Sequence, residues 1–241
     1  AHDIARMSVL DAGWPITTPG VTLHRFCGSG QQAVTVAAQS IMAGHQDLVI
    51  GGGVESMSRY APNHTDGFTA NNTHLFEQYP LIPQGISADL IATIEGFSRE
   101  DVDGYAVRSQ ERTQASIEAG YFKSGLVPIY HSDGRLALDR DEHPRPGTTM
   151  ETMVGLNPSF EKMGKTLYDG QVRTFDDICK SVYPNVKAMT HVHHAGNSSG
   201  VVDGASAILL ASPKYAKAHG LKPRARIVMT ATAGTEPVIM L

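Results

Sequence analysis

The stretch from Val21 to Gly53 constrains the fold of this chain more than any other. It opens with a short run, 21–23, of the β-branched and apolar residues that strands favour. Apolar residues then recur at the spacings of one helical face until Gly44, which is placed as a helix-ending glycine. A second apolar run, 48–50, follows. A strand, a helix and a strand in so few residues predict a βαβ unit, and hence a buried parallel sheet.

Cys27 lies directly before the predicted helix and is flanked by Gly28 and Gly30. The backbone N–H groups of a first helical turn lack partners and the helix dipole is positive there, so this position stabilises a negatively charged sulfur. The thiolate is the nucleophilic form of cysteine, and the two glycines leave its approach open. A small buried core thiol is the alternative, since free cysteine is often buried. The residues alone leave both interpretations open.

Three consecutive motifs surround this cysteine: RFCGSGQQA at 25–33, AQSIMAG at 38–44 and GGVESMS at 52–58. Together they resemble the nucleophile region of the thiolases, the family of acetyl-CoA acetyltransferases and 3-ketoacyl-CoA thiolases. The resemblance implies that Cys27 is the acyl-accepting nucleophile. It also implies an α/β fold, with a thiolase-like αβα layered core, in which helices cover a mixed sheet, and an inserted loop domain.

Helical signals recur elsewhere along the chain. Apolar residues at helical spacing predict helices over 4–12 and 86–94, each followed by a glycine. The segment 98–101 resembles a capping box and predicts a longer helix that runs towards 119–120. Ser212-Pro213 supplies an N-cap and a first-turn proline for a helix that ends at 219–220.

Turn and strand signals complete the prediction. Asp133-Gly134 suits the primed turn of a hairpin over 126–138. The Asn-, His-, Pro- and Thr-rich residues 59–84 predict a loop. We also expect a buried strand at 206–211 and a last strand at 225–233.

Four residues are assigned to coenzyme A by the same resemblance. The segments 141–149 and 156–160 resemble the family's loop domain, where an arginine and a phenylalanine help to hold coenzyme A. AGNSSG at 195–200 resembles the segment whose serine lies against the pantetheine arm. The implied substrate contacts are Arg145, Phe160, Ala195 and Ser199. A guanidinium is a good partner for phosphate, although an exposed loop arginine without a ligand is the alternative for Arg145.

The resemblance also divides the chain. Residues 1–58 match the N-terminal thiolase core, incomplete at its start, and 59–190 match the loop domain with an insertion at 161–190. Residues 191–241 return to the core and begin the link to a C-terminal domain. The histidine, second cysteine and asparagine that the C-terminal half of a thiolase supplies have no counterpart here. We therefore expect either part of a longer enzyme or a fragment without full catalytic equipment.

His191, His193 and His194 raise the question of a metal site. A zinc site needs three or four ligands, and no cysteine or acidic residue is spaced to complete one, so we expect no metal. A histidine acting here as base for Cys27 is a minority alternative, because thiolases place their catalytic histidines elsewhere. Cys179 has no activating neighbours in sequence and is expected to be structural or incidental. We expect no cofactor, with coenzyme A a substrate.

Composition limits the partners. With 20 basic and 24 acidic residues, the net charge of −4 predicts no attraction to nucleic acid. The apolar runs are too short for a membrane span. The opening residues predict an amphipathic helix rather than a signal peptide, and two cysteines without a disulfide pattern suit a reducing compartment. We expect a cytoplasmic protein, or a mitochondrial or peroxisomal matrix protein in a eukaryote, that forms a homodimer or homotetramer.

The predicted function is that of an acyl-CoA acyltransferase working through an acyl-cysteine intermediate. It would cleave 3-ketoacyl-CoA with coenzyme A, or condense two acetyl-CoA molecules. Two alternatives stay open. A ketoacyl synthase also uses a cysteine nucleophile, but takes acyl chains from a carrier protein. A non-catalytic acyl-CoA-binding chain would hold its ligand reversibly and would not be acylated at Cys27.

Overall fold

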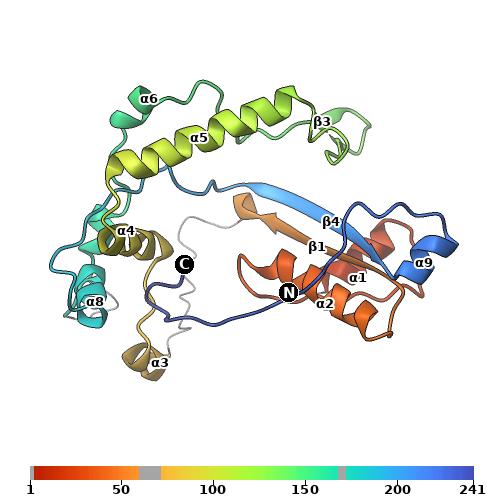
Figure 1. Cartoon of the computed structure of the whole chain (residues 1–241), viewed down its shortest axis with the longest axis horizontal. Coiled ribbons are helices and arrows are strands. Elements are labelled where there is room, and N and C mark those ends of the chain that lie inside the picture. The colour runs from red at the N-terminus through yellow and green to blue at the C-terminus, as the bar shows by residue number, and fades with distance from the viewer. Residues whose placement is uncertain (1–2, 60–71, 168–171) are drawn as a thin grey trace. The chain divides into compact units, whose positions relative to one another are not determined.

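The computed structural model describes residues 3–59, 72–167 and 172–241 (Figure 1). The contacts within the chain divide it into two compact units. Unit 1 consists of Ala1–Ala61 and Val202–Thr232, and unit 2 of Pro62–Val201 and Ala233–Leu241. None of the helices in the described ranges combines the length and the apolar character that crossing a membrane requires.

The centre of unit 1 is a two-stranded antiparallel ribbon. β1 (Leu48–Ser56) pairs with β4 (Asp203–Ala211), and the register places Leu48 opposite Ala211. The two strands lie side by side along their whole length (Figure 1). A segment near the start of the chain is therefore joined to one about 150 residues later, and this pairing brings residues 202–232 into the same unit as α2 and β1.

A helix packs on one face of this ribbon. α2 (Ser29–Met42) lies mainly over β1. Gly51 lets it come close, because a Cβ at this position would lie 2.8 Å from the Cα of Val34. Burial here removes small apolar side chains from water, at about 25 cal/mol per Å². The hydrophobic cluster buried in this contact consists of Ala37, Ala38 and Leu210.

In unit 1, the residues predicted to start or end helices have these roles in the structure. Gly13 and Gly44 take positive φ angles of 69° and 75°, the left-handed conformation that glycine adopts at little cost. The side chain of Ser212 accepts a hydrogen bond from the backbone N–H of Tyr215 at 3.1 Å, as an N-cap does. The other elements of this unit are α1 (Ile4–Asp11), η1 (Met57–Arg59) and α9 (Pro213–Ala218).

Three strand predictions were wrong for unit 1. Residues 21–23 and 225–233 form no strand, and the ribbon is antiparallel rather than the parallel sheet of a βαβ unit. The strand expected at 206–211 exists but begins at Asp203, and most of it is exposed rather than buried. Apolar composition marks a segment able to form a strand, but it does not identify the partner, which here is distant in sequence.

Unit 2 is mainly helical. α4 (Gln84–Glu95) packs against α8 (Phe175–Val182), and α5 (Arg99–Glu118), the longest helix, contacts α6 (Met150–Val154) near its start (Figure 1). Val238, near the end of the chain, is fully buried in the core between α4 and α8. The buried members of this core are Phe76, Ile82, Ile86, Leu90, Phe175, Ile178, Cys179, Val186 and Val238.

Local signals were reliable in unit 2. Ser98 and Asp101 form the predicted capping box, with Asp101 N–H donating to Ser98 Oγ at 3.1 Å and Ser98 N–H to Asp101 Oδ2 at 2.8 Å. Gly96 ends α4 at a φ of 72°. The predicted hairpin forms between β2 (Ile129–Tyr130) and β3 (Leu136–Leu138).

Two segments without a predicted helix contain one. Within 59–84, expected to be a loop, α3 (Thr73–Gln78) places Phe76 in the core, while 60–71 lie outside the described residues. The segment 161–190 contains α7 (Glu161–Gly164) and α8, whose first turn is capped by Thr174. These helices are short, so their periodicity covers too few turns to be recognised.

Candidate functional site

Cys27 is exposed and lies one residue before Gly28, the N-cap of α2. A tight turn holds it there. Gly28 N–H donates to the carbonyl of Arg25, and Ser29 N–H to the carbonyl of Phe26, both at 3.0 Å. The Ser29 hydroxyl accepts from Arg25 N–H at 2.8 Å and donates to the carbonyl of Phe26 at 2.6 Å. The turn thus presents the sulfur to solvent at the start of the helix.

The residue before the cysteine is in a strained conformation. Phe26 has a φ of +46°, in the left-handed region that a bulky side chain rarely adopts. Its ring meets the His24 ring edge-on, with centroids 4.9 Å apart. Such strain costs about 1–3 kcal/mol and persists where the surroundings enforce it, often at functional sites. The strain supports Cys27 as a functional residue.

The four predicted coenzyme A contacts all lie in unit 2, on segments that touch one another. Ser159 N–H donates to the carbonyl of His193 at 2.9 Å, which brings the Phe160 segment beside the one that carries Ala195 and Ser199. The His143 ring lies so close to Gly200 that a Cβ there would overlap it. Residues distant in sequence are therefore gathered on one unit.

The four side chains have different surroundings. The ring of Phe160 covers Gly85 in the first turn of α4, where a Cβ would overlap it. Ala195 and Ser199 are exposed. Arg145 is exposed too, and its backbone N–H donates to Gln110 Oε1 at 2.9 Å, but its guanidinium has no partner among the residues that the structure describes. A free guanidinium is available to an anionic group.

Two buried aspartates that the sequence analysis did not single out hold the segment leading to these contacts. Asp89, on α4, is fully buried. It accepts the backbone N–H groups of Val192 and His193, both at 3.1 Å. The Nδ1 atoms of His191 and His193 lie 2.7 Å from its carboxylate oxygens. Four donors therefore converge on one side chain.

Asp103, on α5, is the second aspartate and is 3% exposed. His194 Nε2 lies 2.7 Å from Oδ1, and Asn197 Nδ2 donates to the same oxygen at 2.8 Å. Arg99 Nε donates to Oδ2 at 2.6 Å. Because His194 Nδ1 accepts the N–H of Gly196 at 3.0 Å, the ring proton resides on Nε2 and points at the carboxylate.

These contacts determine the ionisation of both aspartates. Burial by itself raises the pKa of Asp89, but the hydrogen bonds from His193, His191 and the backbone outweigh it and hold the pKa below its usual value. Burial likewise opposes a lowered pKa at Asp103, where Arg99, His194 and Asn197 prevail. Both side chains are carboxylates at neutral pH.

The three histidines are thus engaged with carboxylates. His191 also places Nε2 3.3 Å from Asp176 Oδ2, so both of its ring nitrogens face acidic oxygens. Within the described ranges, no group of three or more His, Cys, Asp or Glu residues has an arrangement that could hold a metal ion. Cys179 is fully buried, and burial raises the pKa of its thiol to about 12.

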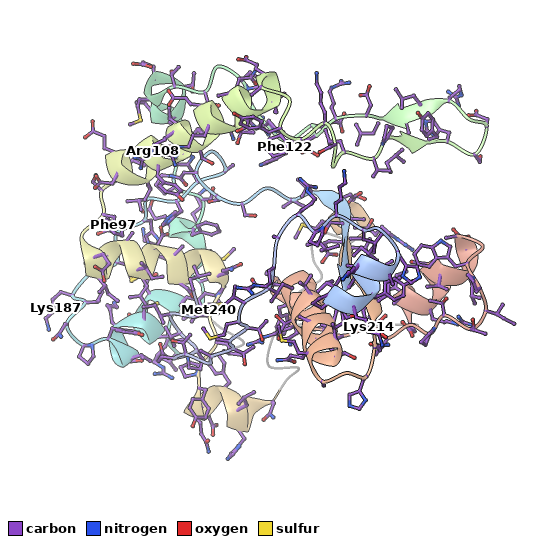
Figure 2. All side chains as sticks on the ribbon, turned by 45° about the vertical axis from the view of Figure 1, so that its right-hand side comes forward. Phe97, Arg108, Phe122, Lys187, Lys214 and Met240 are labelled. Carbon is purple, nitrogen blue, oxygen red and sulfur yellow. The ribbon has the colours of Figure 1, made fainter. Side chains whose placement is uncertain are left out.

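A shallow hollow of ≈ 210 Å³ lies elsewhere, along α5. Arg108 and Phe122, labelled in Figure 2, are among its lining residues. It includes neither Cys27 nor any predicted coenzyme A contact. We treat the Cys27 turn of unit 1 and the gathered segments of unit 2 as two separate candidate regions, because each carries specific chemistry, whereas the hollow is an open groove between surface side chains.

Comparison with known proteins identifies the family. Residues 1–172 match the model of the thiolase N-terminal domain. The chain is 38% identical to the beta-ketoadipyl-CoA thiolase of Pseudomonas aeruginosa, over 99% of this chain and 57% of that protein. It is 37% identical to the acetyl-CoA acetyltransferase of Chromobacterium violaceum, over 98% of this chain and 57% of that protein. The chain belongs to the thiolase family.

Solved structures agree with this fold. The dimeric peroxisomal thiolase of Saccharomyces cerevisiae aligns with a TM-score of 0.71 and 30% identity, over 90% of this chain and 49% of that one. The human mitochondrial 3-ketoacyl-CoA thiolase in complex with CoA aligns with a TM-score of 0.67 and 31% identity, over 92% and 53%. The predicted α/β thiolase fold is confirmed. The chain spans about half the length of these relatives.

Proposed function

We propose that this chain provides the acyl-accepting part of a thiolase. With acetyl-CoA, the sulfur of Cys27 attacks the thioester carbonyl, free coenzyme A leaves, and the acetyl group stays on the sulfur as a thioester. In the degradative direction the sulfur attacks the 3-keto carbonyl of a 3-ketoacyl-CoA instead. The bond between C2 and C3 then breaks, acetyl-CoA leaves once its C2 carbanion has taken up a proton, and the shortened acyl group stays on the sulfur. Coenzyme A then accepts the shortened acyl group. A covalent intermediate divides one difficult step into two easier ones.

The observation that carries this proposal is the setting of Cys27. It is exposed in a strained turn at the start of α2, in a chain that matches thiolases along almost its whole length. The backbone N–H groups of a first helical turn can also stabilise negative charge near the sulfur. Family membership favours this function over a ketoacyl synthase that takes its acyl chain from a carrier protein.

Coenzyme A is proposed to bind along the gathered segments of unit 2. Arg145, with its exposed guanidinium, would contact a phosphate of the ligand. Ser199 and Ala195 would lie along the pantetheine arm, and Phe160 would contribute an apolar surface. The human structure with CoA shows that a protein of this family and fold binds coenzyme A. No resident cofactor is proposed, since coenzyme A is consumed and released as a substrate.

The substrate, assembly and location follow by analogy. Relatives named beta-ketoadipyl-CoA thiolase and acetyl-CoA acetyltransferase suggest a 3-ketoacyl-CoA or acetyl-CoA substrate. The yeast relative is described as dimeric, which supports a homodimer here. Two free cysteines suit a reducing compartment, the cytoplasm or an organelle matrix.

Acylation tests this function directly. Incubation of the chain with acetyl-CoA, followed by peptide mass spectrometry, should place one acetyl group on the peptide that contains Cys27. The Cys27→Ala variant should take up none, whereas Cys179→Ala should be acetylated like the wild type. Reversible acetyl-CoA binding with no acetylated peptide would instead identify a non-catalytic acyl-CoA binder.

A further inference from the structure

We propose that Asp89 and Asp103 are positioning residues that shape the coenzyme A-binding segment 192–199 without touching the ligand. The inference rests on the proposed function. Neither aspartate follows from the family motifs around Cys27, and each lies about ninety residues or more before its partners in the segment 192–199. Both are almost completely buried, so neither can contact a ligand on the surface.

Asp89 fixes the entry to the segment. Its Oδ1 accepts the consecutive N–H groups of Val192 and His193, which have no helix or strand partner because this stretch is irregular. His193 Nδ1 adds a third contact to Oδ1, while Oδ2 faces His191 Nδ1. Buried backbone N–H groups are costly without a partner, so this one carboxylate determines the path of the chain.

Asp103 fixes the turn that follows. Asn197 Oδ1 accepts the N–H of His194 at 2.8 Å, which closes the turn 194–197. The amide Nδ2 of Asn197 then donates to Asp103 at 2.8 Å and to the carbonyl of Val192 at 3.2 Å. Asp103 therefore orients the side chain that closes the turn, and Ala195 projects from that turn.

The packing around the turn admits little adjustment. A Cβ on Gly196 would lie 2.7 Å from Met153 Sδ, and the carbonyl of Met153 accepts Arg99 at 2.8 Å. Arg99 in turn donates to Asp103. The carboxylate of Asp103 thus links the turn 194–197 to α5 and, through Arg99, to α6. Ser199 lies two residues beyond Asn197, so a shift of the turn moves both predicted pantetheine contacts.

The charge of the carboxylates matters as well as their shape. Every atom that faces Asp89 or Asp103 is a nitrogen that can donate a hydrogen bond. A carboxylate accepts on both oxygens, whereas the amide of an Asn substitution would direct an N–H towards at least one of these donors. Asp103→Asn should therefore loosen the turn while leaving the size of the side chain almost unchanged.

The test compares Asp103→Asn and Asp89→Asn with Ile178→Val, which weakens the same unit without touching the segment. Titration calorimetry with coenzyme A, below the unfolding temperature of every variant, should show affinity reduced about tenfold or more for both aspartate variants. Ile178→Val should keep the wild-type affinity. The rate at which iodoacetamide alkylates Cys27 should be the same in all, since the aspartates act on the binding segment alone.

If Asp103→Asn does not fold, Asn197→Ala tests the same step, because it removes the contact to Asp103 and leaves the carboxylate in place. It too should weaken coenzyme A binding about tenfold. Wild-type affinity in Asp103→Asn or Asn197→Ala, together with weakened binding in Arg145→Ala, would overturn the inference and leave the proposed function standing. Failure of the wild type to bind coenzyme A would instead overturn the proposed function, and the inference with it.

Discussion

The two units of this chain differ in the size of their buried cores and in the polar groups that they bury. Unit 1 carries the predicted nucleophile, and in its described part the ribbon and α2 share a hydrophobic cluster of three buried residues, Ala37, Ala38 and Leu210. Unit 2 carries the predicted ligand contacts and buries a core of nine residues. Unit 2 also buries an aspartate completely and a second almost completely, and the carboxylate oxygens of each accept hydrogen bonds.

This difference in burial matches the role predicted for each unit. Cys27 lies exposed in a turn whose geometry is set by a few backbone hydrogen bonds, as the predicted role of a nucleophile that meets its substrate requires. The predicted ligand contacts of unit 2 lie on several segments, and buried polar contacts join these segments. Each carboxylate oxygen of Asp89 and Asp103 has a hydrogen-bond partner, and satisfied contacts of this kind favour a single well-defined arrangement.

The largest expected contrast concerns the two cysteines. The pKa of Cys179 is raised to about 12 by burial and by nearby carboxylates, so at pH 8 only about 10⁻⁴ of this thiol is ionised. Cys27 is exposed at a helix start. Limiting iodoacetamide at pH 8 should therefore alkylate Cys27 and spare Cys179, as read by peptide mass spectrometry. Preferential labelling of Cys179 would show that the assignment of the nucleophile is wrong.

The comparison also shows what could be predicted from the sequence. Helices and their ends were accessible, because caps such as Ser98 and Gly44 act over a few residues. The position of Cys27 directly before a helix followed from the same local signals, whereas its exposure did not, because the residues alone also allowed a buried thiol. The pairing of β1 with β4 was not accessible, since the partner strand lies about 150 residues away and nothing in either strand identifies the other.

The buried aspartates illustrate the same limit within the site. Asp89 falls between Ile86 and Leu90 on the buried face of α4, and an acidic residue in that position signals a buried partner. The histidines that it meets lie more than a hundred residues further on, so the sequence shows an anomaly but not its explanation. Histidines near a predicted ligand contact suggested metal or base chemistry, whereas the structure uses them to hold the chain.

The second prediction tests whether stability is concentrated in unit 2. Ile178 is fully buried in the nine-residue core, so Ile178→Ala should destabilise unit 2 by about 2–5 kcal/mol through lost burial and a cavity. Leu209, on β4 in unit 1, is 55% exposed, and Leu209→Ala should cost below about 1 kcal/mol. Hydrogen exchange with mass spectrometry reads each unit separately. Equal losses of stability from the two substitutions would show that stability is not concentrated in unit 2.

The third prediction is that acid weakens unit 2 more than unit 1. The pKa values of Asp89 and Asp103 are lowered in the folded chain, so the stability that they contribute is present above the unfolded value of about 4 and is lost as the pH falls below it. Asp177, at the start of α8, follows at a pKa of about 2. Of the carboxylates of lowered pKa in unit 1, Asp203 is exposed and Asp3 is half-buried at the start of α1, so both are closer to solvent than Asp89 and Asp103 and contribute less.

Cleavage by pepsin, which is active in acid, would report this loss. Between pH 5 and pH 2 the first new cuts should fall in the segment 84–201, and Asp89→Asn should show them at a higher pH than the wild type. The matched substitution in unit 1, Asp203→Asn, should leave the pattern in 84–201 unchanged. First cuts within 29–56 at every pH would contradict the prediction.

The smallest expected effect concerns the glycines that end helices, where we expect the two units to behave alike. Gly44 in unit 1 and Gly96 in unit 2 each end a helix at a positive φ, 75° and 72°, and a Cβ would meet nothing within 4 Å at either. Alanine at each should therefore cost only the backbone strain, about 1 kcal/mol, and the same amount in both units. Gly104→Ala, within α5 and equally open, should instead stabilise its helix by about 0.5–1 kcal/mol. Hydrogen exchange of α2, α4 and α5 would measure the change in stability for all three variants. If the loss of stability in Gly96→Ala were several times that in Gly44→Ala, the two units would differ in their helix ends as well as in their packing.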